Sequence, residues 1–261
     1  MEHEIWFTAI LNKIFGGAVS ALLAQIATLR GLEWVRPADP AHPIRNYLAM
    51  EILVALVLIV LALVVRSRLS MEHPGTLQHV MEVLVDFIRS TAEEIIGHGA
   101  DRYVPMLGTL FIFILACNLL SLLPAQGVPV PAYGIEVSPT GYIQATLGCA
   151  VAVFLYYNYQ GFRHHGILGY LKHFCGPVLA MAIIMFPIEI IGNVGRLLSL
   201  SVRLYANMLV GGLLEKVFGG LVPLLVPALF MGLHVFVSLL QAYIFMLLPA
   251  VYLSLAVSEE H

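Results

Sequence analysis

The sequence predicts an all-α integral membrane protein, from its composition and from a series of long apolar segments. Of its 261 residues, 60 per cent are hydrophobic and only 11 per cent are charged, too few charges to cover a soluble globule of this size. The mean hydropathy of +0.90 agrees with this assignment. A bilayer core of about 30 Å requires roughly 20 apolar residues per spanning helix. Segments of that length recur along the chain.

Residues 1–45 precede the first clear span and are predicted to form an interfacial or extracytoplasmic segment. The chain begins MEHEIWF, which lacks the basic start of a secretory signal, so we expect no cleavage. Between Ile5 and Leu29, polar side chains such as Asn12 and Lys13 interrupt the apolar pattern. This mixture favours a helix lying in the interface over a helix that crosses the membrane.

Three membrane helices are predicted next, at residues 46–66, 104–123 and 141–159. The first contains the apolar run Tyr47–Val65, broken only by Glu51, which we assign to the membrane interface. The segments between them, 67–103, 124–140 and 160–176, are predicted to be loops. The second loop has four prolines and is typical of irregular turns.

The first loop is predicted to contain an amphipathic helix. Pro74, Gly75 and Thr76 form a helix start signal. After it, apolar residues recur at helical spacing opposite charged ones. The apolar residues are Leu77, Met81, Leu84, Ile88 and Ile95, and the charged ones are Glu82, Asp86, Arg89 and Glu93. We expect this helix to lie on the membrane surface.

Basic residues in the loops predict the orientation, because cytoplasmic loops carry an excess of lysine and arginine. Four lie between Arg66 and Val104, none lies in 124–140, and two lie in 160–176. The first and third loops are therefore predicted to be cytoplasmic. This places the N-terminus outside and the C-terminus in the cytoplasm.

The last third of the chain is predicted to be two long apolar helices, 177–218 and 225–258, joined by a turn at 219–224. A continuous helix from Met181 to Phe218 would be about 57 Å long at 1.5 Å per residue, which exceeds the bilayer core. Either the helix breaks, near Pro187 or Gly192, or it is steeply tilted. The sequence alone leaves both alternatives open.

Each of these two segments has a polar face. At 100° per residue, five polar side chains of the first segment share one face, each within about 40° of the direction of Glu189. They are Glu189, Asn193, Arg196, Arg203 and Asn207. In the second segment, His234, Ser238, Gln241 and Tyr252 share a face. Folding the segments back near residue 222 brings Arg203 level with Gln241.

Arg203 is the strongest candidate for a functional residue. A guanidinium keeps its charge at neutral pH, and burying it near the bilayer centre costs about 2.5–3.5 kcal/mol on insertion scales. Glu189 and Glu215 lie several turns away along the helix, so neither is expected to pair with it. We therefore expect its partner to be a carboxylate on another subunit. Arg196, nearer the end of the segment, could instead reach the interface by snorkelling.

Two motifs and the spacing between them resemble subunit a of the F-type ATP synthase. They are VRLYANMLVGG, residues 202–212, and LLQAYIFMLL, residues 239–248. Weaker support comes from NLLSLLP (118–124) and SPTGYIQATLG (138–148). The resemblance extends from about Ala49 to the C-terminus. It implies about five membrane helices, of which the last two form a long, tilted antiparallel hairpin against a ring of c subunits. It also implies the b subunits of a peripheral stalk and a bacterial inner membrane.

The resemblance implies roles for individual residues. Arg203 matches the family's essential arginine, which faces the c-subunit carboxylate, and Asn207 and Gln241 match its polar neighbours. His234 and Glu189 match positions lining the proton paths, and we add Asn193 and Arg196 from the polar face. The chain departs from many relatives at Gly212, Tyr142 and Gln144, where acidic, histidine or asparagine side chains occur. As a hypothesis, Glu215 replaces the missing acid in a relay with His234.

Other functions are less well supported. A net charge of −3 and the lack of a long basic run argue against nucleic-acid binding. The three cysteines have no metal or redox spacing, so we predict reduced thiols and no metal or cofactor. No Walker-type loop is present, so the chain is not expected to be catalytic alone. A secondary ion-coupled transporter and an intramembrane enzyme using His234 and Glu189 remain as alternatives.

Overall fold

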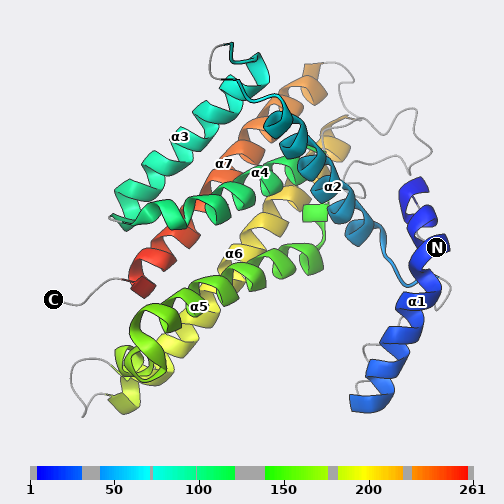
Figure 1. Ribbon diagram of the computed structural model, residues 1–261. Helices are drawn as coiled ribbons and strands as arrows, with labels where there is room; N and C mark the ends of the chain where they lie inside the picture. Colours follow the sequence, from blue (N-terminus) through cyan, green and yellow to red (C-terminus); the bar gives the residue numbers. More distant parts are fainter. Residues whose placement is uncertain are drawn as a thin grey trace.

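The computed structural model is helical throughout its described residues, which are 5–30, 42–70, 73–97, 99–120, 139–175, 182–219 and 225–257 (Figure 1). Within these ranges, the side chains of 29–30, 167–175, 182–184, 215–216, 218–219 and 225–228 are not described. The helices are α1 (Trp6–Arg30), α2 (Asn46–Ser67), α3 (Thr76–Ile96), α4 (Val104–Leu120), α5 (Ile143–Cys175), α6 (Ala182–Gly219) and α7 (Leu225–Val257), with 3-10 helices η2 (Ala100–Arg102) and η4 (Pro139–Gly141). The all-α class is confirmed.

Four helical segments of the described chain are long and apolar enough to cross a membrane, by length and composition. They are Trp6–Thr28, Asn46–Ser67, Met185–Leu214 and Leu229–Val257, and Val104–Leu120 is a shorter apolar helix. The first of these lies in the segment that we assigned to the interface, and that assignment stays a prediction. The exposed residues of α2 are largely leucine, isoleucine and valine, as expected for a helix in lipid.

The N-terminal helix α1 packs against the start of α2 through buried hydrogen bonds. The amide of Asn12 donates to the carbonyl of Ile44 at 3.1 Å and accepts from its N–H at 3.0 Å. The N–H of Ile5 donates to the Asn46 side chain at 3.3 Å. These bonds satisfy backbone groups just before α1, at Ile5, and just before α2, at Ile44, where no helix partner exists.

The predicted amphipathic helix is confirmed as α3, which begins at Thr76 as the start signal indicates. Its apolar face packs on α4 and α7, and Ile88 is buried there. Gly97 ends the helix at φ 81°, and Gly99 at φ 88° begins η2, so the chain turns sharply into α4. Arg89 on the outer face pairs with Asp101 at 2.9 Å.

The third predicted helix is longer than expected. We assigned 160–176 to a loop, but the structure is helical to Cys175, with a kink at Gly166, where φ is 71°. The sequence GFRHHG is polar and has two glycines, a pattern that predicts a turn. Here it forms a helix that bends at a single glycine.

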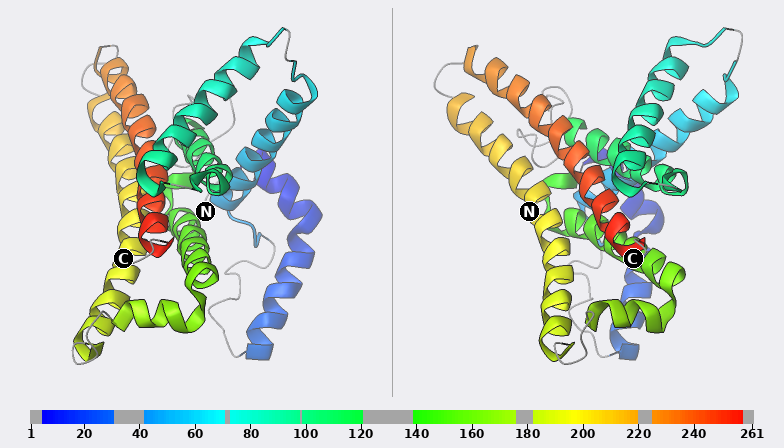
Figure 2. Two further views of the ribbon diagram at one scale, coloured as in Figure 1. Left: turned by 60° about the vertical axis from the view of Figure 1, so that its left-hand side comes forward. Right: turned by 90° about the vertical axis from the view of Figure 1, so that its left-hand side faces the viewer.

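The last two helices, α6 and α7, lie side by side and antiparallel, as the views in Figure 2 show. α6 is one continuous helix through Pro187, so the expected alternative of a break near Pro187 or Gly192 is wrong. Pro187 falls early in the helix, where its missing N–H costs only one backbone bond. The hairpin and the continuous α6 are confirmed, and the connecting residues 220–224 lie outside the described chain.

One hydrophobic core holds α3 to α7 together. Its fully buried members come from five helices and include Ile88, Leu107, Val153, Leu204 and Phe245. α5 covers one side of α6, and α3 and α4 cover α7 (Figure 1). The polar residues of α6 and α7 are thereby fixed in relation to one another by packing of their flanking apolar residues.

We predict that Gly97→Ala destabilises the fold, because a side chain at φ 81° and ψ −143° is strained. The expected loss is about 1–3 kcal/mol, visible as a lower thermal unfolding midpoint of the detergent-solubilised protein. Gly148→Ala is the control, since that helical glycine has open space around its Cα. Equal midpoints for the two variants would contradict the prediction.

Candidate functional site

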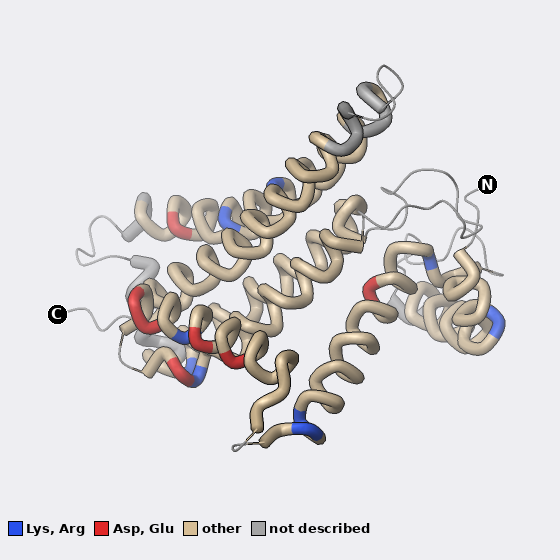
Figure 3. The backbone as a smooth tube through the Cα atoms, turned by 90° about the horizontal axis from the view of Figure 1, so that it is seen from above, with Lys and Arg blue, Asp and Glu red and all other residues tan. Residues whose placement is uncertain are grey.

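The polar sides predicted for α6 and α7 are directed towards the interior of the helix bundle over most of the length of these helices. Asn193, Ser201, His234, Ser238 and Gln241 are buried, and Arg203 and Asn207 are half-buried. Charged side chains are sparse along the helices (Figure 3). Burial of amides and hydroxyls in an apolar bundle is costly unless they find partners, so their contacts define the site.

A hydrogen bond between Asn207 and Gln241 joins the two helices. The Asn207 amide donates to the Gln241 side-chain oxygen at 2.8 Å. Folding the segments back near residue 222 predicted that Gln241 lies level with Arg203. The observed partner of Gln241 is instead Asn207, which lies one turn after Arg203 on α6. The buried Nε2 of Gln241 and the hydroxyl of Ser238 have no partner among the described residues. These groups leave hydrogen-bonding capacity beside the Asn207 contact.

His234 packs directly against the backbone of α6 at Gly211. A Cβ atom built at Gly211 would lie 2.8 Å from Nδ1 and 2.9 Å from Cε1 of His234. The absence of a side chain at this position is therefore what admits the imidazole. Folding the two segments back near residue 222 puts His234 level with Val210, because each lies 12 residues from that point. The structure agrees, since the imidazole lies against the next residue, Gly211. Gly212 was singled out from the resemblance, but the glycine in contact with the imidazole is Gly211.

Asn193 links α6 to α5. The Tyr157 hydroxyl donates a hydrogen bond to the Asn193 side-chain oxygen, and the Asn193 amide donates to Asn158 at 3.2 Å. Tyr157 and Asn158 are functional candidates that sequence reasoning missed. Their signal was the pair of polar residues at the end of an apolar run, in the segment YYNYQ.

Arg196 and Glu189 form an ion pair two turns apart on α6. Their N···O distance is 3.5 Å, and both side chains are half-buried. The guanidinium of Arg196 also lies 5.4 Å from the ring centre of Tyr252 on α7, in cation–π geometry. Tyr252 packs on Tyr157 in turn, with ring centres 5.7 Å apart. Arg196 is therefore held by two partners, Glu189 and Tyr252, so its side chain is not free to snorkel to the interface.

Arg203 has no carboxylate within ion-pair distance among the described residues. Its one recorded side-chain contact is a long hydrogen bond of 3.5 Å from Nη2 to the Ser199 hydroxyl, one turn earlier. The half-buried guanidinium thus has most of its donors available on the polar face. That its partner is a carboxylate of another subunit stays a prediction.

Two further contacts extend the polar region to α4 and α5. The Asn118 amide donates to the carbonyl of Ser238 at 3.4 Å, and Thr146 shares a hydrogen bond with Ser201 at 3.1 Å. Asn118 lies in the motif NLLSLLP, but its role was not predicted. Glu215, the hypothetical relay partner of His234, belongs to α6, and its side chain lies outside the described residues.

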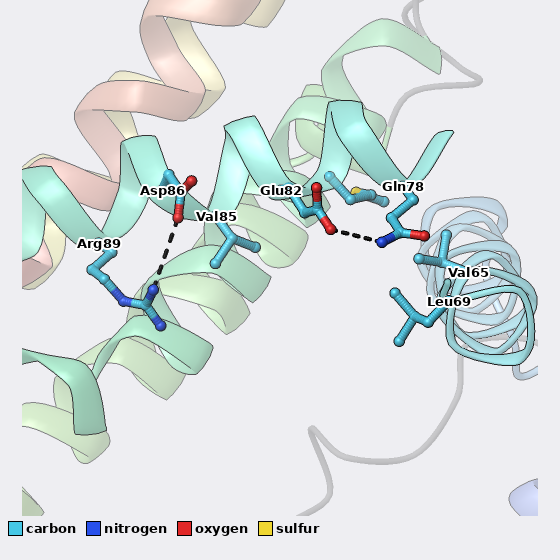
Figure 4. Close-up of a pocket in the computed structure, with 8 residues that line it drawn as sticks. Val65, Leu69, Gln78, Glu82, Val85, Asp86 and Arg89 are labelled. Atoms are coloured by element: carbon cyan, nitrogen blue, oxygen red, sulfur yellow. Dashed lines mark hydrogen bonds and ion pairs between the residues drawn. The ribbon is translucent and has the colours of Figure 1, made fainter. Parts of the chain in front are cut away.

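The structure also has a cleft of about 370 Å³ between the end of α2 and α3 (Figure 4). Its polar groups have partners already: Gln78 donates to Glu82 at 2.8 Å, and Asp86 lies 3.8 Å from Arg89. These contacts give no reason to place a ligand in this cleft. The described residues also contain no cluster of histidine, cysteine, aspartate or glutamate able to hold a metal. The polar region of α6 and α7 is the stronger site.

Residues 48–254 match the family model described as ATP synthase A chain. The chain belongs to this family. It is similar to the ATP synthase subunit a of Koribacter versatilis, at 43% identity over the full length of both chains. It also resembles the subunit a of Solibacter usitatus, at 46% identity over 86% of this chain and 92% of that protein. A third relative, ATP synthase subunit a 3 of Pelobacter propionicus, is 39% identical over 80% of this chain and 86% of its own.

Membership in the ATP synthase A chain family makes the chain a multi-pass membrane component of ATP synthase, associated with ATP synthesis and ion transport. The matched residues include nearly all of α2, all of α3 to α6 and nearly all of α7. The polar contacts among α4, α5, α6 and α7 therefore belong to the matched region, except that α7 extends three residues beyond it.

We predict that Gly211→Ala displaces His234 and destabilises the hairpin. The added methyl group would overlap the imidazole, and overpacking of this kind costs about 1–3 kcal/mol. The thermal unfolding midpoint of the solubilised protein should fall. Gly195→Ala is the matched control on α6, because its Cα faces open space. A Gly211→Ala variant as stable as the control would show that the imidazole moves freely.

Proposed function

We propose that this chain is the stator subunit a of an F-type ATP synthase, which forms two proton half-channels against a ring of c subunits. It would couple the flow of protons across the membrane to rotation of the ring and so to ATP synthesis. The observation that carries the proposal is Arg203, a half-buried cation with no carboxylate partner among the described residues. Such a charge within an apolar helix needs a partner outside the chain.

The proposed mechanism follows from electrostatics. A ring carboxylate facing lipid is neutral and carries a proton, because the low dielectric disfavours its charged form. Beside Arg203 the ionised form is favoured, so the carboxylate releases its proton there. Protons loaded on one side of the arginine and released on the other cross the membrane only if the ring turns. The fixed positive charge also opposes a direct leak between the two paths.

The neighbours of Arg203 support this role because they are neutral. Asn207 and Gln241 are bound to each other at 2.8 Å, so they can hold the guanidinium in place without cancelling its charge. A carboxylate in either position would pair with Arg203 permanently and remove its attraction for the ring. Their hydrogen bond also closes the α6–α7 hairpin next to the arginine.

Two clusters are proposed to line the proton paths. On the uptake side, His234 offers an imidazole whose unperturbed pKa near 6.5 suits proton relay. On the release side, Glu189, Arg196 and Asn193 form the polar cluster towards the start of α6.

We place the protein in a bacterial inner membrane, with the N-terminus outside, the C-terminus in the cytoplasm and the b subunits of a peripheral stalk as further partners. The complex, not this chain alone, would be the enzyme.

The geometry weighs against the two alternatives. Gly211, the contact of His234, follows Glu189 by 22 residues, which is about 33 Å along α6. His234 and Glu189 are therefore too far apart to act as an acid and base on one substrate. A secondary transporter would bind its substrate at broken helices, whereas α6 is continuous.

We predict that Arg203→Ala abolishes ATP-driven proton uptake in inverted membrane vesicles, because no charge remains to discharge the ring carboxylate. After removal of the catalytic head, the passive proton leak of these vesicles should rise. Arg68→Ala, at the exposed end of α2, is the control and should pump normally. Recovery of the whole complex with the variant chain shows that assembly is intact.

Normal pumping by assembled Arg203→Ala would remove the basis of the proposal. Purification tests the transporter alternative separately: the chain should copurify with a large assembly that hydrolyses ATP. A chain that transports ions when purified alone would support the transporter instead.

A further inference from the structure

Glu51 is an acidic residue near one end of the most apolar helix. It lies five residues after the start of α2, about 8 Å along the helix axis. The sequence assigned it to the membrane interface, but the structure shows it half-buried, with Val54 buried one turn further on. In the proposed orientation, this end of α2 is the outer end. A carboxylate here is costly to bury without a function.

Glu51 lies where α2 meets α4, α5 and η4. It is within electrostatic range of the thiols of Cys117 on α4 and Cys149 on α5. One turn earlier, Tyr47 stacks on Tyr142, which precedes α5, with ring centres 5.3 Å apart. Among the described residues, no lysine, arginine or histidine forms an ion pair with Glu51. Nothing in this part of the chain neutralises it.

Polar groups connect this junction to the polar face of the hairpin. Next to Cys117 on α4 is Asn118, which is fully buried and donates to the backbone of Ser238. Ser238 lies one turn from both His234 and Gln241 on α7. Gln241 in turn bonds Asn207, one turn from Arg203. The polar groups thus run from α2 across α4 to the centre of the proposed site.

We propose that Glu51 is the carboxylate through which protons enter the uptake path to His234; this rests on the function proposed above. The carboxylate takes a proton from hydronium in the outer water, leaving water and a neutral carboxylic acid. The acid then gives that proton to water or imidazole further in and returns to its ionised form. Positions 142, 144 and 212 hold Tyr, Gln and Gly in this chain, so none of them carries a carboxylate. Glu51 supplies an acid that these positions lack.

The test uses the purified complex reconstituted into liposomes with its catalytic head outward. ATP synthesis is driven by a potassium diffusion potential, while the pH of the lumen, which is the uptake side, is varied. Glu51→Gln and Glu51→Asp are compared with Glu82→Gln, an exposed carboxylate on α3 outside the proposed path. Arg203→Ala and Glu215→Gln are measured in the same preparations.

We expect Glu51→Gln to lower the synthesis rate at least tenfold and to flatten its dependence on lumen pH. Glu51→Asp should restore most of the rate, with the midpoint of the lumen pH profile shifted and the external pH profile unchanged. Glu82→Gln should match the wild type. A merely structural role for Glu51 would change assembly but would not move the lumen profile alone. The other titratable groups at this junction, Cys117, Cys149, Tyr47 and Tyr142, are unchanged in all variants.

A wild-type rate and lumen profile in Glu51→Gln would overturn the inference. If that variant does not assemble, an unshifted profile in Glu51→Asp overturns it equally. If the synthesis rate no longer depends on lumen pH in Glu215→Gln but still does so in Glu51→Gln, proton uptake is assigned to Glu215 instead. Synthesis at the normal rate by Arg203→Ala would reject the proposed function itself, so the two failures are distinguishable.

Discussion

The cost of removing the guanidinium of Arg203 from water constrains which side chains can surround it. Arg203 stays charged at every physiological pH, so the protein must either pair it or leave it available. The described residues leave it available, with a long hydrogen bond to Ser199 as its recorded partner. Pairing it within the chain would lower its energy but would also neutralise the field that the proposed mechanism needs. The surrounding side chains satisfy both demands by being polar and uncharged.

Close packing of the hairpin is what keeps these neutral groups in register. Without a hydrophobic driving force between helices in lipid, helix association relies on small residues and interhelical hydrogen bonds. Both occur here: Gly211 on α6 admits the imidazole of His234, and Asn207, one turn before Gly211, donates a hydrogen bond to Gln241 on α7. Such hydrogen bonds contribute only about 0.6 kcal/mol on average within membranes. Their greater value is in fixing which side chains lie opposite Arg203.

Much of this arrangement could be predicted from the sequence, because hydropathy and helical periodicity are local signals. The spans, the amphipathic helix from Thr76 and the polar face containing Arg203, Asn193 and Asn207 follow from spacing along one helix. Contacts between helices carry no such signal. The bond from Tyr157 to Asn193 depends on how α5 packs on α6, and the polar segment around Tyr157 does not indicate which residue is its partner.

The helical extension through residues 160–175 was missed for a related reason. Its polar and glycine-rich sequence predicts a turn when read alone, yet only Gly166 adopts a positive φ. Local propensity is a weak guide where neighbouring structure can stabilise a helix. The Glu189–Arg196 ion pair, by contrast, could be predicted from the two-turn spacing on α6 alone. The contact of Arg196 with Tyr252 could not, because it depends on how α6 and α7 pack in the hairpin.

The two ends of the polar region differ in charge, and this difference bears on how a proton would move through it. Towards the start of α6, Glu189 is paired with Arg196, so the cluster is nearly neutral as a whole and its cation is held by Tyr252. At the α2 end, Glu51 has no paired cation among the described residues, so its negative charge is uncompensated. An uncompensated carboxylate attracts protons from water, whereas a paired one holds them weakly. Under the proposed function, this asymmetry would favour proton capture on the Glu51 side and release on the Glu189 side, with Arg203 between them.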